Sequence, residues 1–167
     1  MKIGWSGPRA DLFADPAAAR REVVRRAREL LDCGDVDSFV TGGQRGVDQW
    51  AATVAQGRRL QSEIVLPCPI TRFTEGWAAE DQSELEQLVG SASQVEVVDP
   101  DSLRGALAYD QRNERIVAQS QKLVVIWTGV RRGGTFYTLC AARAAEIDVE
   151  EVVLPGVTDT VLTGRGI

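Results

Sequence analysis

Short runs of apolar, β-branched residues alternate with longer stretches of helical spacing along nearly the whole chain. The expected strands are 2–6, 37–42, 62–68, 93–99, 122–129 and 150–155, and the expected helices are 16–32, 46–58, 80–90, 103–120 and 134–146. Strict alternation of strand and helix is typical of a parallel sheet with helices on both faces. The sequence therefore predicts an α/β fold, a three-layer α/β/α domain with a mainly parallel sheet.

Two local patterns support this arrangement. The runs EIVLP and LVVIW, in the expected strands 62–68 and 122–129, are apolar at successive positions, as strands buried on both faces are. Asp15 precedes Pro16 at the start of the first helix, which is the usual order of an N-cap and a first helical proline. At 167 residues the chain suits one domain. We expect that domain at 1–157 and a short tail at 158–167.

The absence of histidine excludes several kinds of site. A Ser-His triad, a histidine-ligated metal and a histidine general base cannot be built from this chain. Cys33, Cys68 and Cys140 form no CxxC pair, so neither a zinc knuckle nor a disulfide framework is indicated. We expect three buried, reduced thiols. No metal site and no cofactor are expected.

The N-terminal sequence MKIGWSGPRADLF lacks the apolar core of a signal peptide, and no apolar run reaches membrane-spanning length. A cytoplasmic protein without a membrane partner is therefore expected. The net charge is −5 and Lys2 and Lys122 are the only lysines. Because phosphate backbones are gripped by clustered Lys and Arg, a nucleic-acid partner is not expected.

Unusual residues gather where the expected strands end. The first strand ends in SGPR (6–9), the second in TGGQRGVD (41–48), the third in PCP (67–69) and the fifth in TGVRRGGT (128–135). In an open parallel sheet, ligands bind outside the carboxyl ends of the strands. Glycine permits positive φ and close approach of a ligand to the backbone. The Gly-rich turns 41–48 and 128–135 each lead into a helix. Together they can aim backbone N–H groups and the helix N-termini at one anion.

The two turns therefore predict a site for a phosphate-bearing ligand. Neither contains GxGxxG or GxxxxGK[ST], so a standard dinucleotide fingerprint and a P-loop both fit poorly. Tight turns without a ligand remain the alternative. The candidate ligand-binding residues in these strand-end segments are Gly7, Arg9, Thr41, Gly42, Gly43, Arg45, Gly46, Val47, Asp48, Pro67, Thr128, Gly129, Gly133, Gly134 and Thr135.

Two segments carry a resemblance to a known family. TGGQRGVDQWAATVA (41–55) resembles the GGxRGxD…A…A segment of the SLOG superfamily, which includes a domain of the DNA-processing protein DprA and the cytokinin-activating LOG phosphoribohydrolases. YDQRNERIVAQSQKLVVIWTGVRRGGTFYTLCAARAAEIDV (109–149) resembles its RNxxM…aDxlia…GGTxxT…A pattern. The resemblance covers about residues 1–155 in element order. It implies a Rossmann-like domain whose pocket binds nucleotides or their derivatives, and it adds Arg112 and Asn113 to that pocket.

The resemblance also bears on catalysis. LOG enzymes use a helix arginine, which Arg112 matches, and a glutamate just after the Gly-rich turn. Here Gly134-Thr135 is followed by Phe136-Tyr137-Thr138, so the glutamate does not carry over. Breaking an N-glycosidic bond builds positive charge on the ribose, and a carboxylate beside it stabilises that charge. The departure argues against hydrolase activity.

Other carboxylates are the possible substitutes. Asp48, beside Arg45, is the first, with Glu75 and Asp110 after it. If the chain is an enzyme, Arg112 and Asp48 are its catalytic candidates. Asp48 also has a structural alternative, because aspartate at the start of a helix is a good cap.

Several side chains have purely structural interpretations. Arg112 and Asn113 lie within an expected helix and could be solvated or salt-bridged at the surface. Trp5 and Trp127 are expected to pack in the sheet rather than stack on a base. Trp77, which lies with Phe73 in the expected loop TRFTEGW, is expected to form a lid over the pocket.

Three functions follow from these patterns. The first is binding of a nucleotide or nucleotide-derived phosphate ligand, as a sensor or ligand-binding module. The second is an N-glycosidase or phosphoribohydrolase that acts on a nucleoside monophosphate, and the third is DNA binding of the DprA type. The expected partner is a nucleotide-like small molecule, and a homodimer is the expected assembly.

Overall fold

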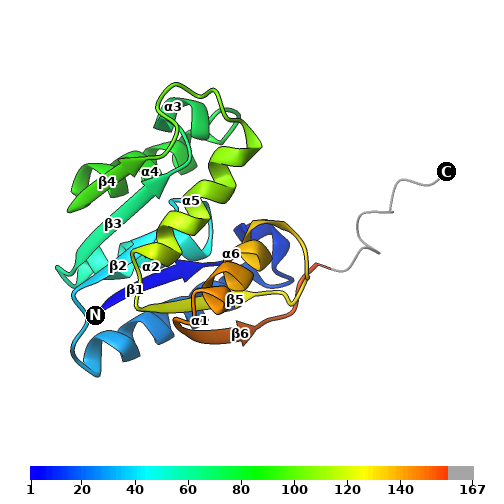
Figure 1. Ribbon diagram of the computed structural model, residues 1–167. Helices are drawn as coiled ribbons and strands as arrows, with labels where there is room; N and C mark the ends of the chain where they lie inside the picture. Colours follow the sequence, from blue (N-terminus) through cyan, green and yellow to red (C-terminus); the bar gives the residue numbers. More distant parts are fainter. Residues whose placement is uncertain (158–167) are drawn as a thin grey trace.

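A computed structural model describes residues 1–157, and the expected tail 158–167 lies outside the described residues. Six strands form one parallel sheet in the order β4-β3-β2-β1-β5-β6 (Figure 1). The strands are β1 Lys2–Ser6, β2 Ser38–Thr41, β3 Gln61–Leu66, β4 Gln94–Val97, β5 Lys122–Trp127 and β6 Asp148–Val153. The helices are η1 Ala10–Leu12, α1 Pro16–Asp32, α2 Val47–Gly57, α3 Ile70–Phe73, α4 Ala79–Ser91, α5 Ala106–Ala118 and α6 Gly133–Ala144. The predicted α/β, Rossmann-like architecture is confirmed.

Alternate residues along each strand point into two different layers. Ile3 and Trp5 of β1 pack with α1 and α2, and Ile64 of β3 packs with α2 and α4. Leu123 and Val125 of β5 pack on the other face, against α5 and α6. The helices α1, α2 and α4 therefore cover one face of the sheet, and α5 and α6 cover the other (Figure 1).

The local signals at the first helix are confirmed. The Asp15 side chain accepts a hydrogen bond from the Ala18 backbone N–H, and Pro16 begins α1.

Trp5 is fully buried, as expected of a sheet position. Trp127 packs face to face with Phe136, at 6.1 Å between ring centroids, so it too serves packing.

Other local expectations were wrong or incomplete. Cys33 and Cys140 are exposed, and only Cys68 is buried, because the first two lie beyond the apolar faces of their helices. α5 begins at Ala106 rather than at 103, since Gly105 has φ +54° and interrupts the helix there. The short elements η1 and α3 were not predicted.

The order of the strands fixes where a ligand can bind. From β1 the chain moves outward through β2, β3 and β4, and it then crosses to β5 on the other side of β1. The switch point of the sheet therefore lies between β1 and β5, where Ser6 pairs with Val125. The two Gly-rich turns follow β2 and β5, so they flank the carboxyl end of β1. Within residues 1–157, no helix is long and apolar enough to cross a membrane.

Candidate functional site

The turn at 41–48, which we call the first turn, is closed by its own side chains. The Asp48 carboxylate accepts hydrogen bonds from the backbone N–H groups of Gly42 (3.1 Å) and Gln44 (3.3 Å). Arg112 of α5 donates from Nη1 to the Gly42 carbonyl at 2.7 Å, and the same nitrogen lies 3.8 Å from Asp48 Oδ2. Asp48 and Arg112 are 5% and 7% exposed. Two of the N–H groups that a phosphate would use are thus occupied.

Glycine is required in the first turn because other atoms fill the space of a side chain. A Cβ at Gly42 would lie 1.8 Å from Arg112 Nη1. Gly46 has φ +104°, and a Cβ there would lie 2.8 Å from backbone atoms of both Pro8 and Ala10. These glycines serve close packing of the turn against α5 and against the segment after β1.

Burial controls the ionisation of the pair inside this turn. Burial raises the pKa of Asp48 to about 6, although Arg112 and the two backbone donors lower it. Burial likewise lowers the pKa of Arg112, against the opposing charge of Asp48. A chain without histidine therefore holds a carboxyl group that titrates near neutral pH.

Two structural alternatives from the sequence are wrong. α2 has Gly46 as its N-cap and no side-chain cap, so Asp48 does not cap the helix but reaches back to the turn before it. Arg112 and Asn113 are buried rather than solvated, because α5 packs both of them against the Gly-rich turns. Their contact with a ligand stays a prediction.

The turn at 128–135, the second turn, is open. Gly133 and Gly134 are exposed and Thr135 is half-buried. α6 begins at Gly133, and its N-cap Arg132 forms no side-chain hydrogen bond to the helix. A Cβ at Gly134 would meet only Asn113 Nδ2, at 3.5 Å. No side chain caps the first turn of this 12-residue helix, whose dipole favours an anion.

The carboxyl end of β1 lies between the two turns and packs closely. A Cβ at Gly7 would lie 2.3 Å from Val47 Cγ2 and 2.5 Å from the Ile126 carbonyl oxygen. Gly7 thus lets the segment after β1 pass between the start of α2 and the end of β5. Arg9, two residues later, keeps an exposed side chain that pairs with Asp11 at 3.2 Å.

The predicted ligand-binding residues consequently fall into two groups, both at the carboxyl edge of the sheet. One group is at least partly exposed: Gly7, Arg9, Arg45, Thr128, Gly129, Gly133, Gly134 and Thr135. The other is buried: Thr41, Gly42, Gly43, Gly46, Val47, Asp48, Pro67, Arg112 and Asn113. The exposed group is accessible to a ligand and the buried group is not, and contact of either group with a ligand stays a prediction.

An aromatic cluster covers the first turn. The Arg45 guanidinium carbon lies 4.8 Å from the Trp77 ring centroid, and Arg45 Nη1 lies 3.2 Å from the Asp81 carboxylate. Phe73 of α3 packs on Trp77 and on Tyr109, at 5.1 and 6.1 Å between centroids. Trp77 therefore belongs to a cover fixed to the first turn by a cation–π contact and an ion pair. Whether it also covers a ligand stays a prediction.

The carboxylates are arranged differently from the sequence expectation. Glu75 is exposed and pairs with Arg72, whereas Asp110 is half-buried on α5. Glu114 was not singled out, yet its carboxylate accepts a hydrogen bond from the hydroxyl of Tyr137, the fifth residue of α6. Its position directly after Arg112-Asn113 was the available signal. Among residues 1–157, no group of three or more His, Cys, Asp or Glu could hold a metal ion.

Sequence comparisons place these features among known proteins. The model of the YspA SLOG family matches residues 18–151. A UPF0398 protein of Lacticaseibacillus casei is 34% identical over 86 residues, which cover 46% of this chain and 44% of that protein. A UPF0398 protein of Shouchella clausii is 22% identical over 129 residues, which cover 75% and 68%. The match thus spans less than half of the first relative.

Solved structures show the same fold. DNA processing protein A from Helicobacter pylori, described for its single-stranded DNA binding mode, superposes with a TM-score of 0.66 at 17% identity, over 90% of this chain and 64% of that one. DprA from Streptococcus pneumoniae gives 0.65 at 16% identity, over 90% and 49%. The structure of TM1055 gives 0.58 at 16% identity, over 89% and 71%. The resemblance to the SLOG superfamily is confirmed.

Proposed function

The chain belongs to the YspA SLOG family, and from this membership and the open second turn we propose that it binds a nucleotide or nucleotide-derived phosphate ligand at the carboxyl edge of its sheet. It acts there as a sensor or ligand-binding module in the cytoplasm. The observation that carries the proposal is the exposed, uncapped N-terminus of α6 beside the switch point. Such a terminus is a ready anion site.

The charges around the second turn support a phosphate there. Arg131 and Arg132 are exposed next to Gly133, and neither forms an ion pair with another of residues 1–157. The N–H groups of Gly133, Gly134 and Thr135 lie in the first turn of α6. Guanidinium groups and helix N–H groups both stabilise phosphate oxygens. The rest of the ligand lies over the carboxyl ends of β1 and β5.

The test is a thermal-shift panel of inorganic phosphate, ribose phosphates, mononucleotides, dinucleotides and the matching nucleosides. Ligand at about 100 times its dissociation constant adds about 2.7 kcal/mol to the free energy of unfolding. For a chain of this size that is an increase in Tm of about 5 to 10 °C. We expect a phosphate-bearing compound to produce it and its bare nucleoside to produce far less.

Gly134→Asp locates the site. A carboxylate in the first turn of α6 suits the helix dipole, so the fold is retained, but it takes the place of the phosphate. Ala144→Asp adds the same charge to an exposed position about 15 Å along the same helix. We expect Gly134→Asp to abolish the thermal shift and Ala144→Asp to retain it. An equal response from both variants, or no response from any compound, contradicts the proposal.

An N-glycosidase is the second candidate, and the observation in its favour is the Glu114 carboxylate beside α6. Against it, Asp48 is buried and held by backbone N–H groups. Glu114 is engaged by Tyr137. We expect no release, or very slow release, of free base from AMP, GMP, CMP and UMP when followed by chromatography. Turnover near an ordinary enzymatic rate of about 1 s⁻¹ would favour the enzyme, and Glu114→Gln and Asp48→Asn would then identify the carboxylate.

DNA binding of the DprA type is the third candidate. Its support is the likeness in fold to DNA processing protein A from Helicobacter pylori, described for single-stranded DNA binding. The net charge of −5 weighs against it. A labelled single-stranded oligonucleotide titrated at low salt tests this candidate, and we expect no saturable binding.

A further inference from the structure

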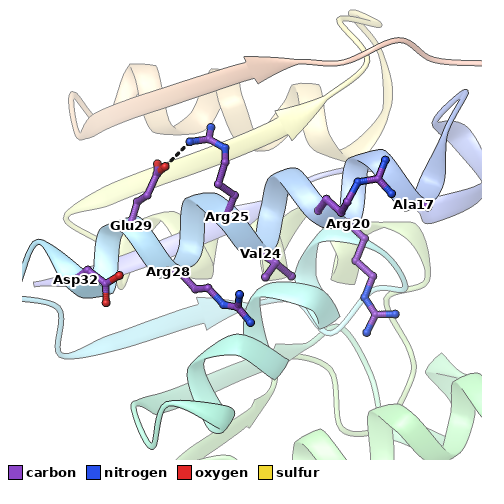
Figure 2. Close-up of a pocket in the computed structure, with 8 residues that line it drawn as sticks. Ala17, Arg20, Val24, Arg25, Arg28, Glu29 and Asp32 are labelled. Atoms are coloured by element: carbon purple, nitrogen blue, oxygen red, sulfur yellow. Dashed lines mark hydrogen bonds and ion pairs between the residues drawn. The ribbon is translucent and has the colours of Figure 1, made fainter.

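A row of arginines follows the outer side of α1. A groove of about 650 Å³ runs along this helix and is lined by Ala17, Arg20, Arg21, Val24, Arg25, Arg28, Glu29 and Asp32 (Figure 2). Arg25 is neutralised by Glu22 and Glu29. Arg20, Arg21 and Arg28 are exposed and form no ion pair with any carboxylate of residues 1–157. Three positive charges therefore lack a counter-ion within the described protomer.

A row of glutamates follows α4 on the same side of the sheet. A second groove, of about 460 Å³, is lined by Ala79, Glu80, Ser83, Glu84 and Gln87. Glu80 and Glu84, about one helical turn apart in this groove, form no ion pair within residues 1–157, whereas Asp81 pairs with Arg45. The groove on α4 thus carries two uncompensated negative charges, and the groove on α1 carries three uncompensated positive charges.

These two rows lie on opposite sides of α2. α2 shares one buried cluster with α1 and another with α4, so it lies between them on this face. The three helices run in the same direction, since each follows one parallel strand and precedes the next. The row on α1 and the row on α4 are therefore roughly parallel and face the same way.

We propose that this face, formed by α1, α2 and α4, is the contact surface for a second copy of the chain, with the arginine row of each α1 against the glutamate row of the partner's α4. A two-fold axis parallel to α2 brings two copies of this face together and forms the contact twice. A two-fold axis in the same plane but perpendicular to α2 sets arginine against arginine. Charge therefore selects the first arrangement.

The dimensions of the face suit a stable dimer. α1 has 17 residues and is about 25 Å long. α2 and α4 have 11 and 13 residues and are about 16 and 20 Å long. Three helices spaced about 10 Å apart therefore cover about 600 Å², at the low end of the roughly 600–1,000 Å² that each partner buries in a standard interface. Arg20 and Arg28 are about 12 Å apart along α1, and Glu80 and Glu84 about 6 Å apart along α4.

A second copy fits the face better than nucleic acid does. A single strand lying across it would meet Glu80 and Glu84 as well as the arginines. Phosphates would then be repelled over one part of the face. A second copy supplies both signs of charge in the matching places.

The test uses the full chain in sedimentation velocity over a range of protein and salt concentrations. Arg21→Glu with Arg28→Glu is the α1 variant, and Glu80→Arg with Glu84→Arg is the α4 variant. We expect a wild-type dimer that weakens with salt, and self-association at least about ten-fold weaker in either variant, because like charges then face each other. Arg131→Glu with Arg132→Glu changes two exposed charges away from the face and is expected to leave the dimer intact.

Mixing separates this arrangement from a general effect of charge. When the α1 variant meets the α4 variant, both contacts pair opposite charges again, so the mixture is expected to form the heterodimer. The chain that carries all four substitutions is expected to form a homodimer for the same reason. A monomeric wild type, variants that associate like wild type, or a mixture that stays monomeric overturns the proposal. An oligonucleotide that binds the wild-type monomer but not the α1 variant also overturns it.

Discussion

The first turn and the second turn both place several glycines and an arginine between a strand and a helix, yet they are built in opposite ways. In the first, Asp48 and Arg112 bind the N–H and carbonyl groups of Gly42, and neighbouring atoms fill the space that side chains at the glycines would need. In the second, Gly133 and Gly134 are exposed and no side chain within residues 1–157 caps the helix. Glycine serves close packing in one turn and access to the backbone in the other.

The difference teaches that glycine content alone does not identify an anion site. What identifies it is whether the N–H groups of the turn already have acceptors. In the first turn a buried carboxylate is that acceptor, so the turn resembles an occupied anion site whose anion belongs to the protein. Among residues 1–157 no carboxylate accepts from the N–H groups of the second turn, which is why the proposed phosphate site is placed there.

The sharpest test of this contrast is one alanine in each turn. Gly46→Ala adds a Cβ at positive φ against two backbone segments, so we expect it to lower the free energy of unfolding by about 4 kcal/mol. Gly134→Ala meets only open space and Asn113, and less than about 0.5 kcal/mol is expected. Urea unfolding of both variants measures the difference, and similar losses would erase the distinction between the turns.

Next in size is the removal of an arginine. Arg112→Met leaves the buried Asp48 carboxylate without its cation and the Gly42 carbonyl without its donor, which is expected to cost about 3 kcal/mol near pH 7. Arg131→Met in the second turn is expected to change stability by less than about 0.5 kcal/mol. Chemical denaturation compares the two substitutions, and a tolerant Arg112→Met variant would show that the first turn does not depend on this pair.

The titration of Asp48 gives a smaller effect of definite sign. Its folded pKa of about 6 lies above the ordinary value of 3.8, so the folded state binds a proton more tightly than the unfolded state does. Stability from this group is therefore gained as the pH falls through 6, by about 2 kcal/mol between pH 7 and pH 4. The difference in free energy of unfolding between wild type and Asp48→Asn, followed from pH 4 to pH 7, isolates the contribution of this carboxyl group. A difference that does not change with pH would refute the raised pKa of Asp48.

The smallest effect concerns the ligand alone. Thr135→Val removes a hydroxyl beside the open N–H groups of α6, so we expect affinity for the phosphate ligand to fall roughly five-fold, the equivalent of one hydrogen bond. Tm without ligand is expected to stay within about 2 °C. Isothermal titration with the best compound of the panel measures the change. Thr41→Val, which alters a fully buried hydroxyl in the first turn, is expected to leave affinity unchanged.

The sequence was sufficient for the architecture because apolar periodicity and turn residues act locally. Each expected strand and helix is present, with bounds shifted by a few residues, and the Asp15 cap is where the pattern placed it. Which of the two turns is closed by its own side chains and which is open could not be predicted in the same way. Arg112 and Gly42 are 70 residues apart in the chain, so the bond that closes the first turn exists only after α5 has packed.

Three further features were not predicted from the sequence, for comparable reasons. α3 has four residues, too few to show periodicity. Glu114 lies at an exposed position of α5, and only the packing of α6 brings the Tyr137 hydroxyl beside it. Cys33 follows the last residue of α1, where the general tendency of cysteine to be buried does not apply.

The central place of β1 also orders events during synthesis. β1 can pair with β2 early, but its other edge has no partner until β5 is made, because Ile3 pairs with Lys122. Roughly 80 residues separate Thr41 from Lys122, which at ribosomal speed take on the order of ten seconds. During that time the nascent chain has an unpaired strand edge, a template for pairing with another chain. The carboxyl ends of β1 and β5 therefore come together late, and the edge of the sheet where the ligand is proposed to bind exists only once β5 has been made.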